Sequence, residues 1–345
     1  MPSRKILCAA VALALALVAA SARAQSSEGQ YKVTQTFKIG GTGGWDYLTV
    51  DPQAKRLYVP RSTHTTILEA ETGKTIFDIP GQQRNHGVAI VPDLNRGFIT
   101  DGKAGDVTVF DTNTFKVLGK VKAAEDADGI VYDPMTKNLL ISCGDAAQLM
   151  VIPADIDVSS GQAAGTPIDL GGKPEFLAAH HGKAYVNLED KDQVAVVDIK
   201  AAKVLDRWSV APAGGAPVGM AIDHASGRLF IGCRKPQKLI VMSADDGKVL
   251  SDLPIGAGVD ATKFDDDVFA SCGDGTLTVA REAGGIFQVV QTLQTPRGAR
   301  TMGVDPTTHT LYLPTAEFEP QSQGQSRPRP KPGSLMIVVV TSSGK

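Results

Sequence analysis

The chain has 345 residues, of which 42% are hydrophobic and only 21% charged, and its formal net charge is -2. This length can bury a large core, and the 36 Gly and 20 Pro suit a turn-rich, all-β domain. The near-neutral charge argues against a general surface for nucleic acid or anionic membranes.

The first 24 residues have the pattern of a signal peptide. Arg4 and Lys5 precede an apolar run from Ile6 to Ala20, and Ala22-Arg23-Ala24 matches a small-residue cleavage site. The alternative, a transmembrane anchor, is disfavoured because the 15-residue run is short for a bilayer. We therefore expect cleavage between Ala24 and Gln25, a periplasmic or secreted product, and no membrane span after removal of the signal.

Seven similar units follow one another along the rest of the chain. Each opens with an apolar run such as DYLTVD, HGVAIV or DGIVYD, and the runs recur every 40 to 47 residues. The units start at Asp46, His86, Asp128, Glu175, Val218, Asp260 and Arg300. A repeat of about 40–45 residues is typical of a propeller blade with four short strands.

Within a unit, the pattern predicts four strands and no helix. The first apolar run ends in a turn such as Asp51-Pro52 or Asp133-Pro134, and a second run such as RLYV or NLLI follows. Two further segments alternate between apolar and polar residues, as in DVTVFD. Alternation and β-branched residues favour strands.

The two ends of the chain are predicted to complete one blade. Residues 31–39 are predicted to form a strand that precedes the first unit and belongs to none of the seven. The seventh unit has only three predicted strands, the last at 335–340. Pairing them would close the ring and leave no open edge, which also favours a monomer. We therefore predict a single seven-bladed β-propeller over residues 25–345, with a mobile Pro-rich insert at 319–332.

Three short motifs resemble a known repeat. Tyr-Val-Pro at Tyr58, Tyr-Val-Asn at Tyr185 and Tyr-Leu-Pro at Tyr312 are similar to the Tyr-Val-Thr-Asn signature of YVTN-type propellers. The whole mature chain resembles the YncE-like periplasmic seven-bladed members of that family. The resemblance implies the fold and the export route, and it defines no chemistry.

The first residues of the units are expected to surround one mouth of the central channel, where propellers usually bind ligands. Acids, an imidazole and a guanidinium converge there. The predicted ligand-binding residues are Trp45, Asp46, Arg61, His86, Asp128, Glu175, Asp260 and Arg300. The alternative is that the carboxylates are hydrated or bond to the backbone, and that Trp45 belongs to the core.

The same ring offers ligands for a metal ion. Asp128, Glu175, Asp260 and His86 would suit Ca²⁺ or Mg²⁺, because hard cations prefer oxygen ligands. Zinc or copper would need a cysteine thiolate, and the cysteines are expected further from the axis. With a metal bound, His86 is a candidate base and Arg300 a site for an anionic substrate.

Cysteines Cys143, Cys233 and Cys272 each end the second strand of a unit. We expect small buried residues there, with a Cys233–Cys272 disulfide as the alternative. The equivalent residues of the other units are Arg61, Asp101, Asn187 and Thr315. The turns of the opposite face carry His180, His181, His224 and His309, which are predicted to be solvated.

Three functions remain open from the sequence. The first is an exported propeller that binds a small molecule, a metal ion or a protein segment at the mouth. The second is a metal-dependent hydrolase, lactonase or lyase, and the third is an envelope scaffold that uses the insert at 319–332. No nucleophile elbow, phosphate loop or dinucleotide motif is present in the sequence.

Overall fold

The computed structural model describes residues 30–320 and 328–343. The predicted signal peptide and residues 321–327 of the predicted insert lie outside these ranges. Within the described part of the chain the only helices are two 3₁₀ turns, η1 (Pro92–Leu94) and η2 (Glu189–Lys191). In these ranges no helix has the length and apolarity needed to cross a membrane.

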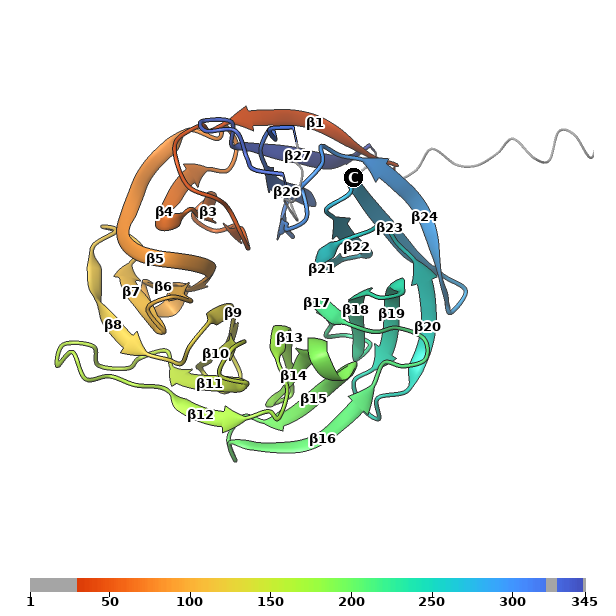
Figure 1. The fold of residues 1–345 in the computed structure, drawn as a ribbon, viewed down its shortest axis with the longest axis horizontal. Coiled ribbons are helices and arrows are strands. Elements are labelled where there is room, and N and C mark those ends of the chain that lie inside the picture. The colour runs from red at the N-terminus through yellow and green to blue at the C-terminus, as the bar shows by residue number, and fades with distance from the viewer. Residues whose placement is uncertain (1–29, 321–327, 344–345) are drawn as a thin grey trace, which may run out of the picture.

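The strands form seven antiparallel blades arranged in a ring (Figure 1), as predicted. Blades 1 and 2 share one continuous sheet, and each of the others is a separate four-stranded sheet. Blade 1 contains β2 (Thr49–Asp51), β3 (Arg56–Pro60), β4 (Ser62–Glu69) and the first part of β5 (Thr75–Val91). Blade 2 contains the rest of β5, β6 (Arg96–Asp101), β7 (Asp106–Asp111) and β8 (Val117–Lys122).

The remaining blades follow the same order, from the innermost strand outward. Blade 3 contains β9 (Ala127–Asp133), β10 (Asn138–Cys143), β11 (Gln148–Pro153) and β12 (Thr166–Asp169). Blade 4 contains β13 (Pro174–His180), β14 (Lys183–Leu188), β15 (Gln193–Asp198) and β16 (Lys203–Ser209). Blade 5 contains β17 (Pro217–Asp223), β18 (Arg228–Arg234), β19 (Gln237–Ser243) and β20 (Val249–Pro254). Blade 6 contains β21 (Val259–Asp265), β22 (Asp267–Cys272), β23 (Thr276–Ala283) and β24 (Ile286–Gln294).

Blade 7 is built from both ends of the described chain. It contains β25 (Gly303–Asp305), β26 (Thr310–Thr315), β27 (Met336–Ser343) and, as its outermost strand, β1 (Gln30–Lys38). The strands β1 and β27 are antiparallel, with Gln30 opposite Ser343 and Lys38 opposite Met336. The N-terminal strand therefore closes the ring, as the sequence predicted.

The innermost strands of blades 1 and 7 are shorter than their apolar runs suggest. The backbone at the start of each run bonds to a neighbouring blade instead of its own blade. In blade 1, Tyr47 N donates to His86 O of blade 2 at 3.1 Å. In blade 7, Arg300 O accepts from Ala261 N of blade 6 at 3.1 Å. The residues Asp46 and Arg300 thus remain at the mouth, but they precede the strands β2 and β25.

The turns between the first two strands of the blades are closed by their aspartates. Asp133 accepts hydrogen bonds from Thr136 N and Thr136 Oγ1 at 3.1 and 2.6 Å. Asp305 accepts equivalent bonds from Thr307 N and Thr307 Oγ1 at 2.8 and 2.6 Å. A short polar side chain that bonds to the backbone two or three residues later stabilises a tight turn. These turns therefore have a structural role.

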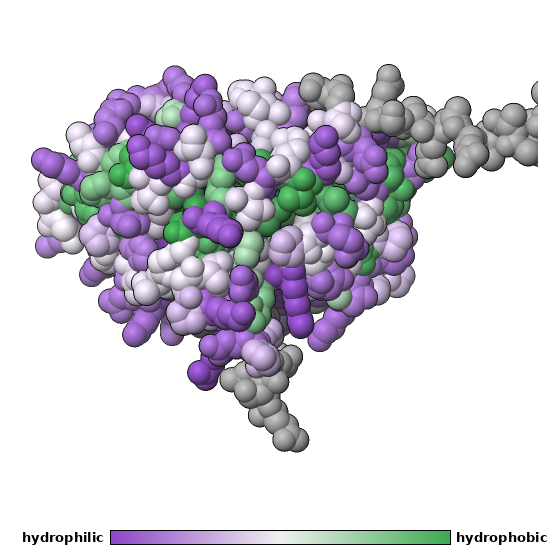
Figure 2. Space-filling view, turned by 90° about the horizontal axis from the view of Figure 1, so that it is seen from above, coloured by the Kyte–Doolittle hydropathy of each residue, from purple (hydrophilic) through white to green (hydrophobic). Residues whose placement is uncertain are grey.

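The core lies between adjacent blades. One of its clusters joins Tyr58 and Ile67 of blade 1 to Phe110 and Ile99 of blade 2. Figure 2 views the rim of the disc, where apolar side chains form a band between more polar surfaces. Exposed apolar residues of the outer strands include Phe77 and Ile286, at 42% and 69%.

Candidate functional site

The residues that open the blades meet at one mouth of the ring, and they separate into two clusters. The first cluster is Asp46, His86 and Asp128, and the second is centred on Asp260 and Arg300. The clusters approach each other where Arg300 Nη2 lies 4.0 Å from Asp46 Oδ1. Val218, the remaining apolar member of the ring, is fully buried.

In the first cluster one imidazole lies between two carboxylates. His86 Nδ1 is 2.7 Å from Asp46 Oδ2 and 3.6 Å from Asp128 Oδ1. Burial lowers the pKa of His86, but the hydrogen bond to Asp46 and the charge of Asp128 together raise it above its ordinary value. Burial also raises the pKa of Asp128 to about 7, against the opposing effect of His86. One ligand atom from each residue lies within 4.8 Å of the other two, a spacing that can hold a metal ion.

In the second cluster Asp260 is paired with two arginines. Its Oδ2 lies 2.5 Å from Arg300 Nε, and its Oδ1 lies 2.5 Å from Arg234 Nη2. Arg234 also donates to Glu189 Oε1 at 2.9 Å. Because both oxygens of Asp260 are occupied by guanidinium groups, this carboxylate is a poor metal ligand.

Glu175 lies apart from the imidazole and beside other acids. Burial and the neighbouring Asp128 and Glu189 carboxylates raise the pKa of Glu175 to about 9. Without a cation nearby, Glu175 is therefore protonated at neutral pH. Of the four predicted metal ligands, His86 and Asp128 lie together with Asp46 in a group of ligand atoms, whereas Glu175 and Asp260 lie outside that group.

Residues that end the second strand of each blade hold the loops beneath the mouth. Arg61 is only 1% exposed, and its guanidinium donates to the carbonyls of Gly40, Thr42 and Gly44 at 2.7 to 3.1 Å. Asn187 donates to Val218 O at 2.9 Å, from one blade to the next. Arg61, predicted from its position to bind ligand, braces the glycine-rich segment before Trp45.

The three cysteines occupy equivalent positions and are all free and buried. Burial raises the pKa of each thiol to about 12. The small-residue interpretation of Cys143, Cys233 and Cys272 thus agrees with the structure, and the alternative disulfide between Cys233 and Cys272 is not formed.

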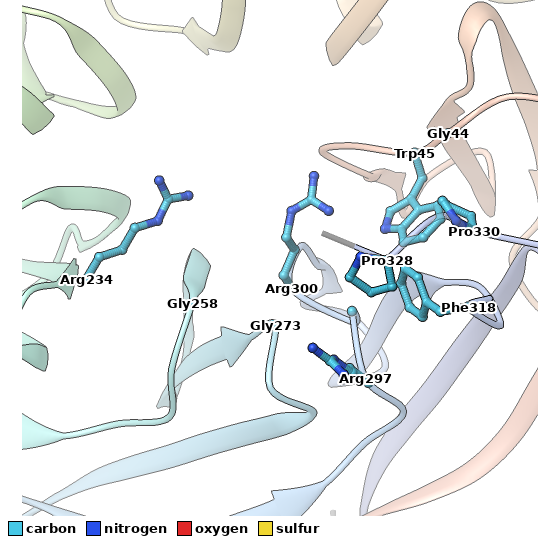
Figure 3. A pocket seen from close by; sticks show the side chains of 11 residues that line it. Gly44, Trp45, Arg234, Gly258, Gly273, Arg297, Arg300, Phe318, Pro328 and Pro330 are labelled. Carbon is cyan, nitrogen blue, oxygen red and sulfur yellow. The ribbon is translucent and has the colours of Figure 1, made fainter. Parts of the chain in front are cut away.

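Beside the second cluster lies a cavity of about 470 Å³. Arg234, Arg297 and Arg300 line one part of it, and Trp45 and Phe318 line another. Figure 3 shows Arg300 between Arg234 and a group made of Trp45, Phe318, Pro328 and Pro330. Trp45 is 9% exposed and packs edge-on against Phe318, with ring centroids 6.1 Å apart. It therefore serves both the core and the wall of the cavity.

The two described ends of the insert are tied together at this cavity. Glu319 N donates to Arg329 O and Lys331 N donates to Glu317 O, both at 2.8 Å. Pro328 and Pro330 thereby form part of the cavity wall. The described flanks of the predicted insert consequently belong to the mouth.

Deeper in the ring, side chains from distant blades meet on the axis. The rings of Tyr47 from blade 1 and Phe176 from blade 4 lie 4.9 Å apart. On Phe176 rests Lys263 of blade 6, with its Nζ 4.9 Å from the ring centroid. Burial and the carboxylates around it raise the pKa of Tyr47. These three residues narrow the channel between the mouth and the opposite face.

Several of these residues were not predicted as site residues. Tyr47 and Phe176 each follow the first residue of a unit, where other units have Gly87, Gly129 and Gly219. A bulky ring among glycines at equivalent positions was the signal that could have identified them. Arg234, Arg297 and Phe318 lie outside the aligned positions, so the repeat gave no such signal.

No protein family model matches the chain, and no curated protein matches it either. Among solved structures, hydrazine synthase of Kuenenia stuttgartiensis is similar, with a TM-score of 0.66 and 13% sequence identity. The match covers 79% of this chain and 92% of that chain. Similarity at this identity shows the fold alone, and the YVTN-type assignment stays a prediction. The chain is a β-propeller.

Proposed function

We propose that this chain is an exported, periplasmic β-propeller that binds a small ligand, or a partner segment, bearing an anionic group at the channel mouth. The cavity lined by Arg234, Arg297, Arg300, Trp45 and Phe318 carries the proposal. Arginines suit carboxylates and phosphates, and the aromatic walls suit a flat apolar body. Arg234 and Arg300 share Asp260, whereas Arg297 forms no ion pair within the described residues. Arg297 is therefore the guanidinium most available to an anion.

The test uses the fluorescence of Trp45, which lines the cavity. The chain has two tryptophans, so a Trp208→Phe background leaves Trp45 as the only tryptophan, and its emission is excited selectively over that of the tyrosines. We expect phenyl phosphate to change this emission saturably, and phenol, which lacks the charge, to bind at least tenfold more weakly. In the same background, Arg297→Gln should lower the affinity for phenyl phosphate at least fivefold.

Arg329→Gln is the matched control for this experiment. Like Arg297→Gln, it removes one positive charge, but it does so in the insert, where Arg329 does not line the cavity. Its affinity for phenyl phosphate should stay within twofold of the parent. Equal losses in the two arginine variants, or no saturable change in Trp45 emission, would show that the cavity is not an anion site.

A second candidate function is a metal-dependent hydrolase, lactonase or lyase, favoured by the convergence of Asp46, His86 and Asp128. These residues would hold a cation such as Ca²⁺ or Mg²⁺, which could polarise a substrate oxygen or activate water. His86 Nδ1 is hydrogen-bonded to Asp46 Oδ2, so a cation that binds both residues must displace the proton shared by these two atoms.

We therefore expect cation binding to be weaker at pH 6 than at pH 8. Elemental analysis of the protein purified at pH 8, and its thermal shift on adding Ca²⁺ or Mg²⁺, measure this directly. Asp128→Asn should lose the metal and the shift, whereas Glu175→Gln should keep both. Absence of a bound metal and of any cation-dependent shift at pH 8 would exclude the metal-dependent candidate.

A further inference from the structure

The opposite end of the channel contains a second cavity, of about 430 Å³. It shares no lining residue with the arginine cavity at the mouth. The inner strands of blades 3 to 6 form its walls, which include Phe176, Met220 and Ile222. Three histidines, His180, His181 and His224, stand at its outer end. The cavity thus extends from the layer of Tyr47, Phe176 and Lys263 to the far face.

Lys263 is exceptional among the residues that line this channel. It is the fourth residue of its unit, and the other units have small or apolar residues at that position. Those residues are Thr49, Ala89, Val131, Ala178, Ala221 and Gly303. A single ammonium group therefore projects among side chains that are small or apolar.

No carboxylate of the described chain pairs with this amine. The acids at this end are already engaged: Asp133 and Asp223 accept hydrogen bonds within their own turns, and Asp265 Oδ2 lies 2.9 Å from His309 Nδ1. The Phe176 ring is the contact that partly compensates the charge. Burial lowers the pKa of the Lys263 amine to about 8, so it is largely protonated at neutral pH.

Of the three histidines at the outer end, His181 and His224 are exposed, as the sequence predicted, and only His180 is buried. His180 is only 9% exposed, and its Nδ1 lies 3.0 Å from His224 Nδ1, so one ring donates to the other. Burial and the neighbouring His181 and His224 lower the pKa of His180. A neutral His180 at this position can donate a hydrogen bond to a guest without repelling Lys263.

We propose that this cavity is a second binding site, for a small monoanion with an apolar or aromatic body whose carboxylate pairs with Lys263. A half-buried ammonium without a counterion is unfavourable, and an entering carboxylate would supply the missing partner. The apolar body would lie against Phe176 and Met220, where the cavity is lined by hydrophobic side chains.

Isothermal titration with sodium benzoate, and with benzamide as its neutral counterpart, tests this site. Benzoate should bind saturably, and benzamide at least tenfold more weakly, because it has no charge for Lys263. Lys263→Met should reduce benzoate affinity at least tenfold, whereas Lys263→Arg should stay within fivefold because it keeps the charge. Lys263→Gln provides a second uncharged variant, and circular dichroism shows whether each variant is folded.

Arg297→Gln separates this site from the mouth, and it should leave benzoate affinity within twofold of the parent. If benzoate affinity depends on Arg297 and not on Lys263, the benzoate site is at the mouth and the proposal is wrong. Failure of benzoate to saturate by about 20 mM, or equal binding of benzamide, would also overturn it. The site at the mouth is tested separately, by the response of Trp45 emission to phenyl phosphate. One of the two proposals can therefore fail while the other holds.

Discussion

Asp128 and Asp260 open equivalent units, yet their neighbours give them different chemistry. Asp260 has a guanidinium on each oxygen, whereas Asp128 faces only His86, 3.6 Å away. Asp128 Oδ1 is buried without a hydrogen-bond partner among the described residues. The unsatisfied oxygen makes Asp128, rather than Asp260, the acid that a cation or ligand would engage.

Because the mouth contains the half-buried acids Asp128 and Glu175, we predict that the protein loses stability as the pH rises. Burial raises the folded-state pKa of Asp128 to about 7 and of Glu175 to about 9, so the folded state binds more protons than the unfolded state above pH 5. The raised pKa of His86 acts in the same direction. The free energy of unfolding should therefore fall by several kcal/mol between pH 5 and pH 8, because each extra proton held by the folded state contributes about 1.4 kcal/mol per pH unit.

Urea unfolding at pH 5, 6.5 and 8 measures this fall. Asp128→Asn removes one titrating acid, so its free energy of unfolding should change less with pH and exceed that of the parent by about 1 kcal/mol at pH 8. The free energy of unfolding of Glu175→Gln should likewise change less with pH and exceed that of the parent at pH 8. A parent protein whose stability rises from pH 5 to pH 8 would contradict the assignment of protonated acids to the mouth.

At the scale of elements, β5 is the segment that carries His86 to the mouth. It belongs to two blades, pairing with β4 in one half and with β6 in the other. Asp101, at the end of β6, is fully buried and accepts hydrogen bonds from Gln83 N and Arg84 N of β5, at 2.7 and 3.1 Å. This carboxylate fixes the backbone immediately before His86.

Asp101→Ala should therefore cost about 2–4 kcal/mol of unfolding free energy, because three backbone N–H groups, including that of Ala104, lose a charged acceptor. The control is Asp106→Asn on the neighbouring strand β7. Asp106 pairs with Lys120, whose side chain is 42% exposed, and such pairs contribute less than about 1 kcal/mol. Chemical denaturation compares the two variants, and an equal cost for both would refute the bracing role of Asp101.

The repeat predicted the elements well because each blade obeys the same local rules. Period, turn aspartates and alternating strands located the seven blades and the closing strand β1. The pairing at the mouth was beyond the reach of that pattern. Arg234 reaches Asp260 from the preceding blade, and Tyr47 meets Phe176 from almost the opposite side of the ring. Such contacts depend on the curvature of the ring and on side-chain length, which one unit of sequence does not encode.

At the scale of the whole molecule, the ring depends on a strand far from its partner in sequence. The strand β1 pairs with β27, and Tyr31 also connects it to blade 6. Tyr31 is 2% exposed, and its ring packs edge-on against Phe269 with centroids 5.0 Å apart. Its hydroxyl donates to Asp267 Oδ2 at 2.9 Å. The Tyr31 side chain thus helps to join the last blade to its neighbour across the closure.

Tyr31→Ala should lower the free energy of unfolding by about 3–5 kcal/mol, since it empties a buried site between two blades. Tyr31→Phe keeps the contact with Phe269 and loses only the hydroxyl, so it should cost about 1 kcal/mol. Asp267 retains Arg281, whose Nε and Nη2 each lie 2.6 Å from its oxygens, which limits that cost. Val33→Ala, on the same strand but 40% exposed, is the control and should cost well under 1 kcal/mol. Urea unfolding followed by circular dichroism ranks the three variants. A Tyr31→Ala protein as stable as Val33→Ala would mean that blade 7 closes the ring without this residue.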